Sequence, residues 1–376
     1  MTTLMQANEQ WSKRPADQRF VSLLDLQKKV NTDRENSIGS VVSTRKIKVI
    51  PHPANPMKGV TIEGSSGLYD PTHWSFGQLA SLAGAPAGYL RTLPAPLVAD
   101  AMNYGLRFNR DAEDVGVLRT KTSLDLGDDS GITEHVELRA ATGPRYGRIW
   151  NGDIVDSLVQ RFGDGLSGDF RVPGEFGKAV PVTKENTTIY GSDRDIFVFL
   201  ADEVNRVEVS NRRDGQAGSL ARGFFVWNSE VGSQTMGVGM FLFDYVCMNR
   251  IIWGVKEFKE VRLRHTMSAP ERFVEEVAPI LTAYSQASAL PIEQTIKAAQ
   301  AAKIESDLDV FLKNRFTAAE STAIKAAHMR EEGRPIETIW DATAGVTAYA
   351  KTIRNQDNRV SMERKGGALL DLVSDF

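Results

Sequence analysis

Residues 218–254 read GSLARGFFVWNSEVGSQTMGVGMFLFDYVCMNRIIWG and form the most aromatic stretch of the chain. Two apolar runs, Phe224–Trp227 and Met236–Met248, flank the small polar residues Asn228–Ser233. Small polar residues and glycine between two apolar runs favour a turn, so the stretch predicts a β-hairpin. We expect this hairpin to form the core around which the rest of the fold is arranged.

The second run of the hairpin has two apolar faces. Successive side chains of a strand point to opposite sides of the sheet, and a strand that is apolar on both sides belongs in the sheet centre. Glycines two positions apart on one face leave a flat patch that a ring, a ligand or another backbone can approach closely. One face carries Gly237, Gly239, Phe241, Phe243 and Tyr245, and the other carries Met236, Val238, Met240 and Leu242.

The composition is that of an ordinary globular protein, with 376 residues, 41% of them hydrophobic and 25% charged. A net charge of -3 argues against a protein that is basic over its whole surface, but it leaves room for a local basic groove. The single cysteine, Cys247, excludes an internal disulfide framework and fits a buried thiol in a reducing compartment. No signal-peptide pattern and no apolar run of membrane-spanning length occur, so we expect a cytoplasmic protein with no membrane partner.

Strand patterns end where helix patterns begin, near Ser268. This segregation predicts the α+β class, with a mainly antiparallel sheet core, flanking helices and an all-helical C-terminal region. We expect a polar and partly mobile N-terminal segment at 1–40, a sheet domain at 41–267 and a helical region at 268–376. Within the first segment, Leu23, Leu24, Leu26 and Val30 predict one short amphipathic helix that docks on a neighbouring surface.

Alternation, turn residues and capping patterns predict the remaining elements. Asn151 is the expected N-cap of a helix, and capping boxes are expected at Ser75–Gln78, Ser268–Glu271 and Thr317–Glu320. The expected strands are 41–50, 115–120, 132–141, 146–150, 169–172, 187–190, 196–201, 206–210 and 258–266. After the first helix, a second is expected to begin at Ser75. Further helices are expected at 96–109, 153–162, 269–288, 291–303, 305–315, 318–332, 336–354 and 361–373.

Several segments resemble the phage/plasmid-like protein family, also called domain of unknown function 932. The segments similar to that family are Tyr89–Pro94, Leu138–Tyr146, Trp227–Gly232, Val238–Phe243, Val246–Asn249, Arg264–Thr266, Trp340–Thr343 and Val346–Tyr349. The resemblance covers most of residues 70–355 and departs at Arg250, where glycine is expected. It implies a mobile-element or viral setting in a bacterial host cell, and it assigns no activity.

Motifs for nucleotide hydrolysis, dinucleotide binding and closed zinc sites do not occur in the sequence. We therefore expect no cofactor, no metal site and no catalytic residues of these kinds. Acidic pairs at strand spacing, Asp193 with Asp195 and His135 with Glu137, either converge on a metal or lie on solvated strand edges. They keep a metal-dependent nuclease, or another phosphate-handling hydrolase that uses Asp193, Asp195, His135 or His265, as an alternative function.

Basic and aromatic residues interleave along consecutive expected strands. This pattern suits single-stranded nucleic acid, because cations follow phosphates while rings stack on bases without reading sequence. It also suits exposed strand faces that carry Lys and Arg to prevent edge pairing. The candidate nucleic-acid-binding residues are Arg119, Lys121, Arg139, Arg145, Tyr146, Arg148, Trp150, Arg212, Arg213, Lys256, Lys259, Arg262 and Arg264.

The function expected from these patterns is non-enzymatic binding of single-stranded nucleic acid, for annealing or protection in phage or plasmid replication and recombination. The nuclease remains one alternative. A third reading is an interaction protein that blocks a host defence or repair factor through its helical end. Self-association and a host protein partner stay open, as does the choice between DNA and RNA.

Overall fold

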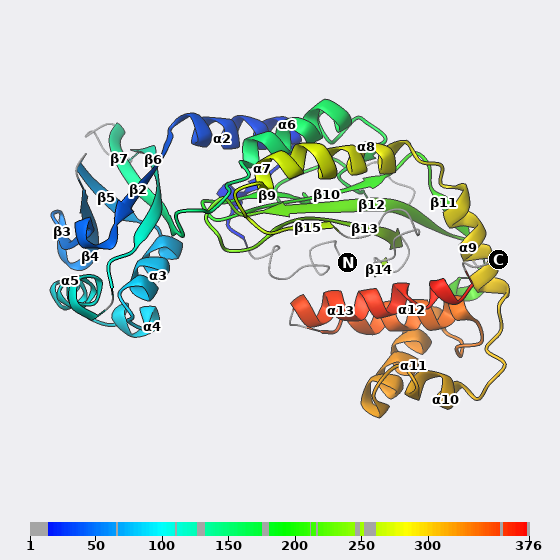
Figure 1. Cartoon of the computed structure of the whole chain (residues 1–376). Coiled ribbons are helices and arrows are strands. Elements are labelled where there is room, and N and C mark those ends of the chain that lie inside the picture. Colours follow the sequence, from blue (N-terminus) through cyan, green and yellow to red (C-terminus); the bar gives the residue numbers. More distant parts are fainter. Residues whose placement is uncertain are drawn as a thin grey trace.

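The computed structural model describes residues 14–64, 67–109, 111–125, 132–174, 180–210, 212–215, 217–244, 249–251, 261–353 and 356–373. It contains two mainly antiparallel sheets with helices beside them, and a series of helices that follows the last strand (Figure 1). The expected α+β class with a helical C-terminal region is therefore confirmed. Among the described residues, no helix combines the length and the apolar character that crossing a bilayer requires.

The larger sheet has the predicted hairpin at its centre. Its main strand order is β1 (Arg19–Phe20), β9 (Ile189–Gly191), β10 (Ile196–Asp202), β12 (Gly218–Asn228), β13 (Met236–Asp244) and β14 (Asn249–Ile251). Three short strands extend it, with β8 (Phe170–Arg171) on β10, β11 (Val207–Val209) on β12 and β15 (Val261–Leu263) on β13. Arg250, where the family resemblance departs, lies in β14 opposite Phe243, so the chain continues there as a strand.

Glycines and aromatic rings face each other across the hairpin. The pairs are Trp227 with Gly237, Phe225 with Gly239, and Phe241 with Gly223. A Cβ atom added at any of these three glycines would lie well inside van der Waals distance of the ring opposite. Each missing side chain thus makes the space in which a ring lies, which is the use that the sequence predicted for two of the glycines.

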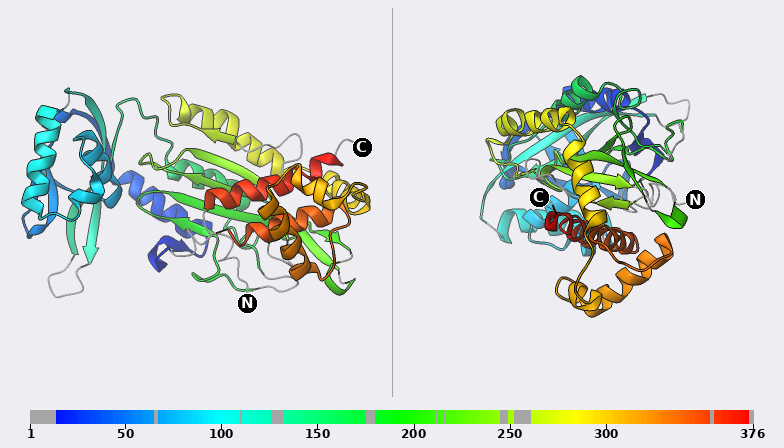
Figure 2. Two further views of the ribbon diagram at one scale, coloured as in Figure 1. Left: turned by 90° about the horizontal axis from the view of Figure 1, so that it is seen from below. Right: turned by 90° about the vertical axis from the view of Figure 1, so that its right-hand side faces the viewer.

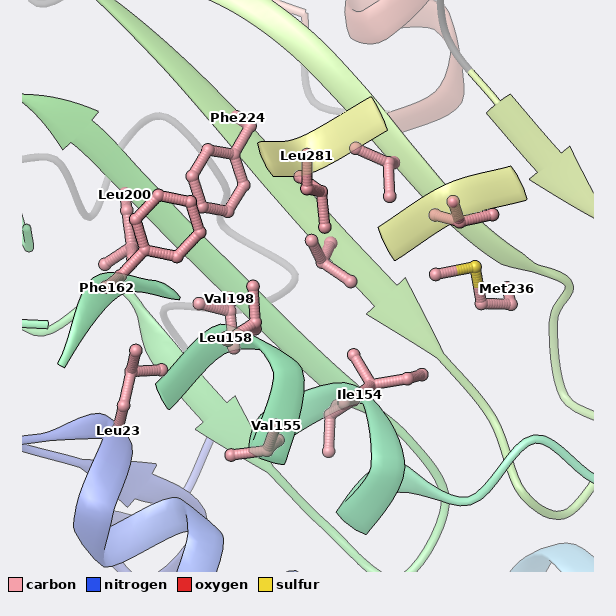
Figure 3. Packing of buried hydrophobic residues seen from close by; sticks show 14 of the residues in the cluster. Leu23, Ile154, Val155, Leu158, Phe162, Val198, Leu200, Phe224, Met236 and Leu281 are labelled. Atoms are coloured by element: carbon pink, nitrogen blue, oxygen red, sulfur yellow. The ribbon is translucent and has the colours of Figure 1, made fainter. Parts of the chain in front are cut away.

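One face of the larger sheet is covered by helices. Four helices lie on it (Figure 1), namely α2 (Leu23–Glu35), α6 (Asn151–Phe162), α7 (Ala269–Arg272) and α8 (Ala278–Gln286), with a π-helical turn at Phe273–Val277 between the last two. Figure 3 shows the apolar layer that they form with the strands, including Leu23, Leu158, Val198, Phe224 and Leu281. Each such side chain contributes about 1.5–3 kcal/mol by leaving water.

The opposite face of the larger sheet is aromatic. Phe199 makes edge contacts with Phe241 and Phe243, and Phe225 stacks on both Phe197 and Trp227. Among the described residues, this buried cluster draws its side chains from strands alone. Both faces of β13 are therefore buried, as its two apolar faces predicted.

The smaller sheet is a separate unit with its own core. Its strand order is β2 (Ser37–Ser43), β6 (Asp114–Asp125), β7 (Ile132–Thr142), β5 (Gly67–Pro71), β4 (Asn55–Gly64) and β3 (Lys48–His52). The helices α3 (His73–Leu82), α4 (Ala87–Leu90) and α5 (Ala95–Tyr104) pack against it. Figures 1 and 2 show this unit at one end of an elongated molecule. The stretch 41–267, expected as one sheet domain, thus contains two sheets.

The C-terminal helices form a third core at the other end of the larger sheet (Figure 2). They are α9 (Leu290–Ala301), α10 (Leu308–Lys313), α11 (Ala318–Glu332), α12 (Ile339–Ala350) and α13 (Gln356–Gly367), followed by a 3-10 turn at Leu370–Leu372. Helix α12 is buried on nearly every side and packs on both α11 and α13. The capping box of Thr317 and Glu320 begins α11 as predicted, and left-handed Gly333 ends it.

Five local predictions were wrong. Residues 146–150 form no strand, and 41–50 are divided by a 3-10 turn at Thr44–Lys46. The N-caps of α3 and α6 are Thr72 and Trp150, because Ser75 and Asn151 already lie inside those helices. Ser268 makes no capping hydrogen bond. In contrast, Ser22 caps α2, whose Leu23, Leu26 and Val30 are buried as expected while Leu24 is exposed.

The glycine and ring pairs predict a large loss of stability for Gly239→Val. The added side chain must displace the Phe225 ring inside a packed sheet, so we expect the free energy of unfolding to fall by about 2–3 kcal/mol. Denaturant titration measures this. Gly39→Val in β2 is the matched control, because no atom lies within 4 Å of a Cβ built there. Equal stability of the two variants would contradict the close packing of the Phe225 ring against Gly239.

Candidate nucleic-acid interface

The turn of the central hairpin connects the two sheets through Glu230, whose side chain is 2% exposed. One carboxylate oxygen lies 3.0 Å from Nη2 of Arg139 in the smaller sheet. The other accepts a hydrogen bond of 2.7 Å from the backbone N–H of Asn151, in the first turn of α6. A carboxylate at a helix N-terminus also meets the positive end of the helix dipole. One acidic side chain thus holds three elements together.

Other groups of the turn add contacts to the smaller sheet and its helix. The carbonyl of Val231 accepts hydrogen bonds from Trp74 Nε1 at 3.0 Å and Gln78 Nε2 at 2.8 Å. Gln78 Oε1 in turn accepts from the backbone N–H of Ala141 in β7. Gln78, expected as part of a capping box, instead joins helix α3 to both sheets. Gly232 adopts the left-handed conformation with φ +83, which glycine tolerates best.

A β-bulge directs Arg139 toward this turn. The pairing of β6 with β7 shifts between Leu118, which is opposite Ala140, and Arg119, which is opposite Leu138. Arg139 is therefore the extra residue of β7. It pairs with Glu230 and donates to the carbonyl of Asp193 at 2.9 and 3.2 Å. A candidate phosphate ligand by its sequence, Arg139 is 3% exposed and holds the two sheets together.

Two distant segments with candidate residues lie side by side next to the turn. The backbone N–H of Gly147 donates to the carbonyl of His265 at 3.0 Å, and His265 Nδ1 lies 3.0 Å from the carbonyl of Gly147. The rings of Tyr146 and His265 stack with centroids 4.7 Å apart, and the Tyr146 hydroxyl donates to the carbonyl of Ser229. Burial raises the pKa of Tyr146 and lowers that of His265, so both rings are neutral at pH 7.

Arg148 and Trp150 belong to the same contact region. Arg148 donates to the carbonyl of Glu230, and its guanidinium lies 5.5 Å from the Tyr146 ring centre and 5.7 Å from that of Trp150. Burial lowers the pKa of Arg148, while the nearby Glu230 carboxylate opposes this shift. The Trp150 ring is half-buried and also contacts Arg34. These two candidates are thus engaged with protein groups in this structure.

Three candidate arginines next to this contact are exposed. Arg145 and Arg264 lie within two residues of the Gly147–His265 contact, and Arg262 lies in β15. Arg262 is opposite Gly237, and its guanidinium lies 5.7 Å from the ring centre of half-buried Trp227. Within the described residues, neither Arg145 nor Arg264 forms an ion pair with a carboxylate. We call Arg145, Arg262 and Arg264 the arginine surface.

The remaining candidates lie elsewhere. Arg119 and Lys121 belong to β6 of the smaller sheet, and Lys121 is exposed. Arg212 is 1% exposed and pairs with Asp244 at 2.6 Å and with Glu332 of α11, so it anchors the C-terminal helices to the larger sheet. Arg213 is exposed near this site. Lys256 and Lys259 lie outside the described residues.

The residues named for the hydrolase alternative do not converge on one site. Asp195 is buried and pairs with Arg14, while Asp193 is exposed. His135 Nε2 lies 3.6 Å from Glu137 Oε1, and burial raises the pKa of Glu137. Over the part of the chain that the structure describes, no three His, Cys, Asp or Glu side chains gather closely enough to hold a metal ion.

Two residues that help to organise this region, Glu230 and Trp74, are not among the candidates from the sequence. The sequence pattern places Glu230 in a polar turn, although an acidic residue between two buried strands also indicates a buried partner. No sequence motif points to Trp74, which lies between two surface hollows of about 310 and 610 Å³, and Arg194 lies 5.8 Å from its ring centre.

Comparison of the chain with protein-family models, curated proteins and solved structures finds no match.

Removing the charge of Glu230 should destabilise the fold. Glu230→Gln keeps the shape of the side chain and leaves the buried Arg139 guanidinium without its carboxylate, so we expect a loss of about 3–5 kcal/mol in the free energy of unfolding. The matched control is Glu63→Gln, which removes an exposed pair with Lys48 and should cost about 1 kcal/mol or less. Similar losses in the two variants would contradict the linking role of Glu230.

Protonation of His265 should oppose folding. Burial lowers its pKa in the folded protein, so the unfolded chain binds a proton first as the pH falls through about 6.5, and stability declines below that pH. We expect His265→Gln to flatten this decline in the free energy of unfolding between about pH 7.5 and about pH 5.5. Burial lowers the pKa of His328 as well, so His265→Gln/His328→Gln should flatten it further. An unchanged slope in both variants would show that neither ring is protected from protonation.

Proposed function

We propose that the protein binds single-stranded nucleic acid, without cleaving it, through the arginine surface of Arg145, Arg262 and Arg264. The observation that supports the proposal is the contact between Gly147 and His265, which brings two cationic segments together from distant parts of the sequence. The sequence pattern alone predicts candidate residues in each segment. A shared binding role requires these segments to lie close together, and the Gly147–His265 contact supports that requirement.

The spacing of the cations suits a polyanion. Strand β15 is shorter than the expected strand at 258–266 and ends at Leu263, so Arg262 lies in it and Arg264 directly follows it; both arginines are exposed, while Leu263 between them is buried. Residues two apart in an extended chain are about 7 Å apart, which is close to the phosphate spacing of an extended single strand. Arg145 adds a third cation from the neighbouring segment, while the net charge of -3 keeps the rest of the molecule from attracting polyanions generally.

A single strand suits this surface better than a duplex does. Reading a duplex usually places a helix of several turns in the major groove. Helix α4, which the basic residue Arg91 follows, has only four residues, and Arg91 donates to the carbonyl of His73. The half-buried Trp227 ring beside Arg262 offers an aromatic neighbour for an unpaired base.

The resemblance to the phage/plasmid-like protein family gives the proposal its setting. Annealing or protection of single strands during replication or recombination of a mobile element, in a bacterial host cell, is the task that we propose. Self-association would extend the arginine surface along a strand. The task in replication or recombination and the self-association both depend on the proposed binding of single strands.

Reversing two arginines tests the binding surface. Arg262→Glu/Arg264→Glu should abolish binding of a fluorescent single-stranded oligonucleotide, because the surface would then repel phosphates. The matched control is Lys313→Glu/Arg330→Glu, which changes the net charge equally at exposed positions of the C-terminal helices. Circular dichroism and thermal unfolding should be the same for both variants and the parent.

The salt dependence of binding gives a second measure. Each lost phosphate contact flattens the slope of log affinity against log salt by about 0.7, so Arg262→Gln/Arg264→Gln should lower the slope by about 1.4. Parent-like affinity in the charge-reversed variant, or no binding by the parent protein, would refute the proposal. Cleavage of the oligonucleotide in the presence of Mg²⁺ would favour the hydrolase instead.

A further inference from the structure

The smaller sheet surrounds a cavity of about 620 Å³. Its walls come from β2 at one end of the strand order and from β4 near the other, so the sheet curls around the space. Leu79 of α3 and Leu138 of β7 also line it. This volume lies within the range of about 300–1,000 Å³ that is usual for sites that bind small molecules.

Arg119 lines this cavity with only neutral hydrogen-bond partners among the described residues. Its Nη1 donates to the Tyr69 hydroxyl at 2.8 Å, and its Nη2 lies 3.4 Å from Ser40 Oγ. Its Nε is buried and has no hydrogen-bond partner. The guanidinium also lies 5.1 Å from the Tyr69 ring centre. Arginine stays charged in proteins, and a charge held away from water without an anion is unfavourable.

The other charges of the cavity lie toward solvent. Lys46, Glu63 and Asp114 are exposed, and Glu63 pairs with Lys48 at 2.6 Å. Arg119 is half-buried by comparison. The cavity therefore has charges of both signs at its mouth and one cation deeper inside.

The inner wall is apolar. The side chains of Ile62, Val117 and Leu138 line the cavity and also belong to the buried core of the smaller sheet. Tyr69 is buried beside them, with its ring against Gly64, where an added Cβ would collide with it. An apolar wall with a few convergent polar groups is the usual form of a site for a small organic ligand.

The β-bulge of β7 also affects this cavity. It leaves Arg119 opposite Leu138 while Arg139 turns to the other side, toward Glu230. The two arginines of neighbouring strands are thereby separated, one to a carboxylate and one to a cavity. Bulges often re-aim side chains beside functional sites.

We propose that this cavity binds a small organic molecule with an apolar body and one anionic group, which pairs with Arg119. The apolar body would lie against Ile62, Val117 and Leu138, and the anion would accept hydrogen bonds from the guanidinium and from Ser40. A carboxylate or a phosphate both fit this description. The site is separate from the arginine surface, so it stands or falls independently of nucleic-acid binding.

Ligands that differ only in their head group test the proposal. We expect octanoate to bind the full-length protein in isothermal titration calorimetry and to raise its thermal midpoint, whereas octylammonium and octanol should bind at least about tenfold more weakly. Octyl phosphate distinguishes a preference for phosphate from one for carboxylate. Equal affinity for octanoate, octylammonium and octanol would refute the role of the Arg119 charge.

Two variants locate the binding. Arg119→Met keeps an apolar side chain of similar length and should weaken octanoate binding by about tenfold or more, because it removes a charge-assisted hydrogen bond. Arg107→Met is the control, since Arg107 is an exposed arginine of the same unit outside the cavity wall. Ser40→Phe fills the space without changing any charge, and it should also prevent binding.

The experiments distinguish a failure of the cavity proposal from a failure of the nucleic-acid proposal. Octanoate binding that survives in both Arg119→Met and Ser40→Phe, or that is absent in the parent, would overturn the inference. Thymidine monophosphate serves as a further probe, and if it alone bound in the cavity, the apolar body of the ligand would be wrong. Loss of oligonucleotide binding in Arg262→Glu/Arg264→Glu with octanoate binding intact is the result expected if both proposals are correct.

Discussion

The fold depends on one buried carboxylate at the tip of the central hairpin. Glu230 bonds at once to Arg139 of the smaller sheet and to the first turn of α6, and the neighbouring Val231 carbonyl binds Trp74 and Gln78. A charge in this position is stable only while all of its partners are in place, because an unpaired buried ion costs several kcal/mol. The relative placement of the two sheets is therefore tied to the formation of the hairpin turn.

A second constraint acts along the hairpin itself. Aromatic rings occupy the space beside Gly223, Gly237 and Gly239. A side chain added at any of these glycines would collide with the ring opposite. The glycines lower the strand propensity of the sequence, and the packed rings compensate for this. The same device recurs in the smaller sheet, where Tyr69 lies over Gly64.

The sequence was most informative where local chemistry decides the outcome. Alternation predicted the hairpin and its two faces, and the Thr317–Glu320 pattern predicted the start of α11, because partners in these features lie within a few residues or on adjacent strands. The roles of the arginines could not be predicted in this way. Arg139 and Arg212 look like exposed phosphate ligands in the sequence, and only their contacts with the remote carboxylates of Glu230 and Asp244 identify them as members of buried ion pairs. The bulge at Arg139 also breaks the alternation on which sequence reasoning relies.

The position of the smaller sheet within the chain has a consequence for biosynthesis. Helix α2 belongs to the core of the larger sheet, yet the smaller unit, residues 37–142, follows it before α6 returns to that core. The chain leaves the core of the larger sheet after α2 and returns to it at α6. These two places are close together, since Arg34 at the end of α2 pairs with Asp153 at the start of α6. The smaller unit is thus an insertion whose ends meet, and such units can generally fold by themselves. On the ribosome this unit is complete before α6 and β9, against which α2 packs, have been made, so α2 is synthesised well before it can be buried.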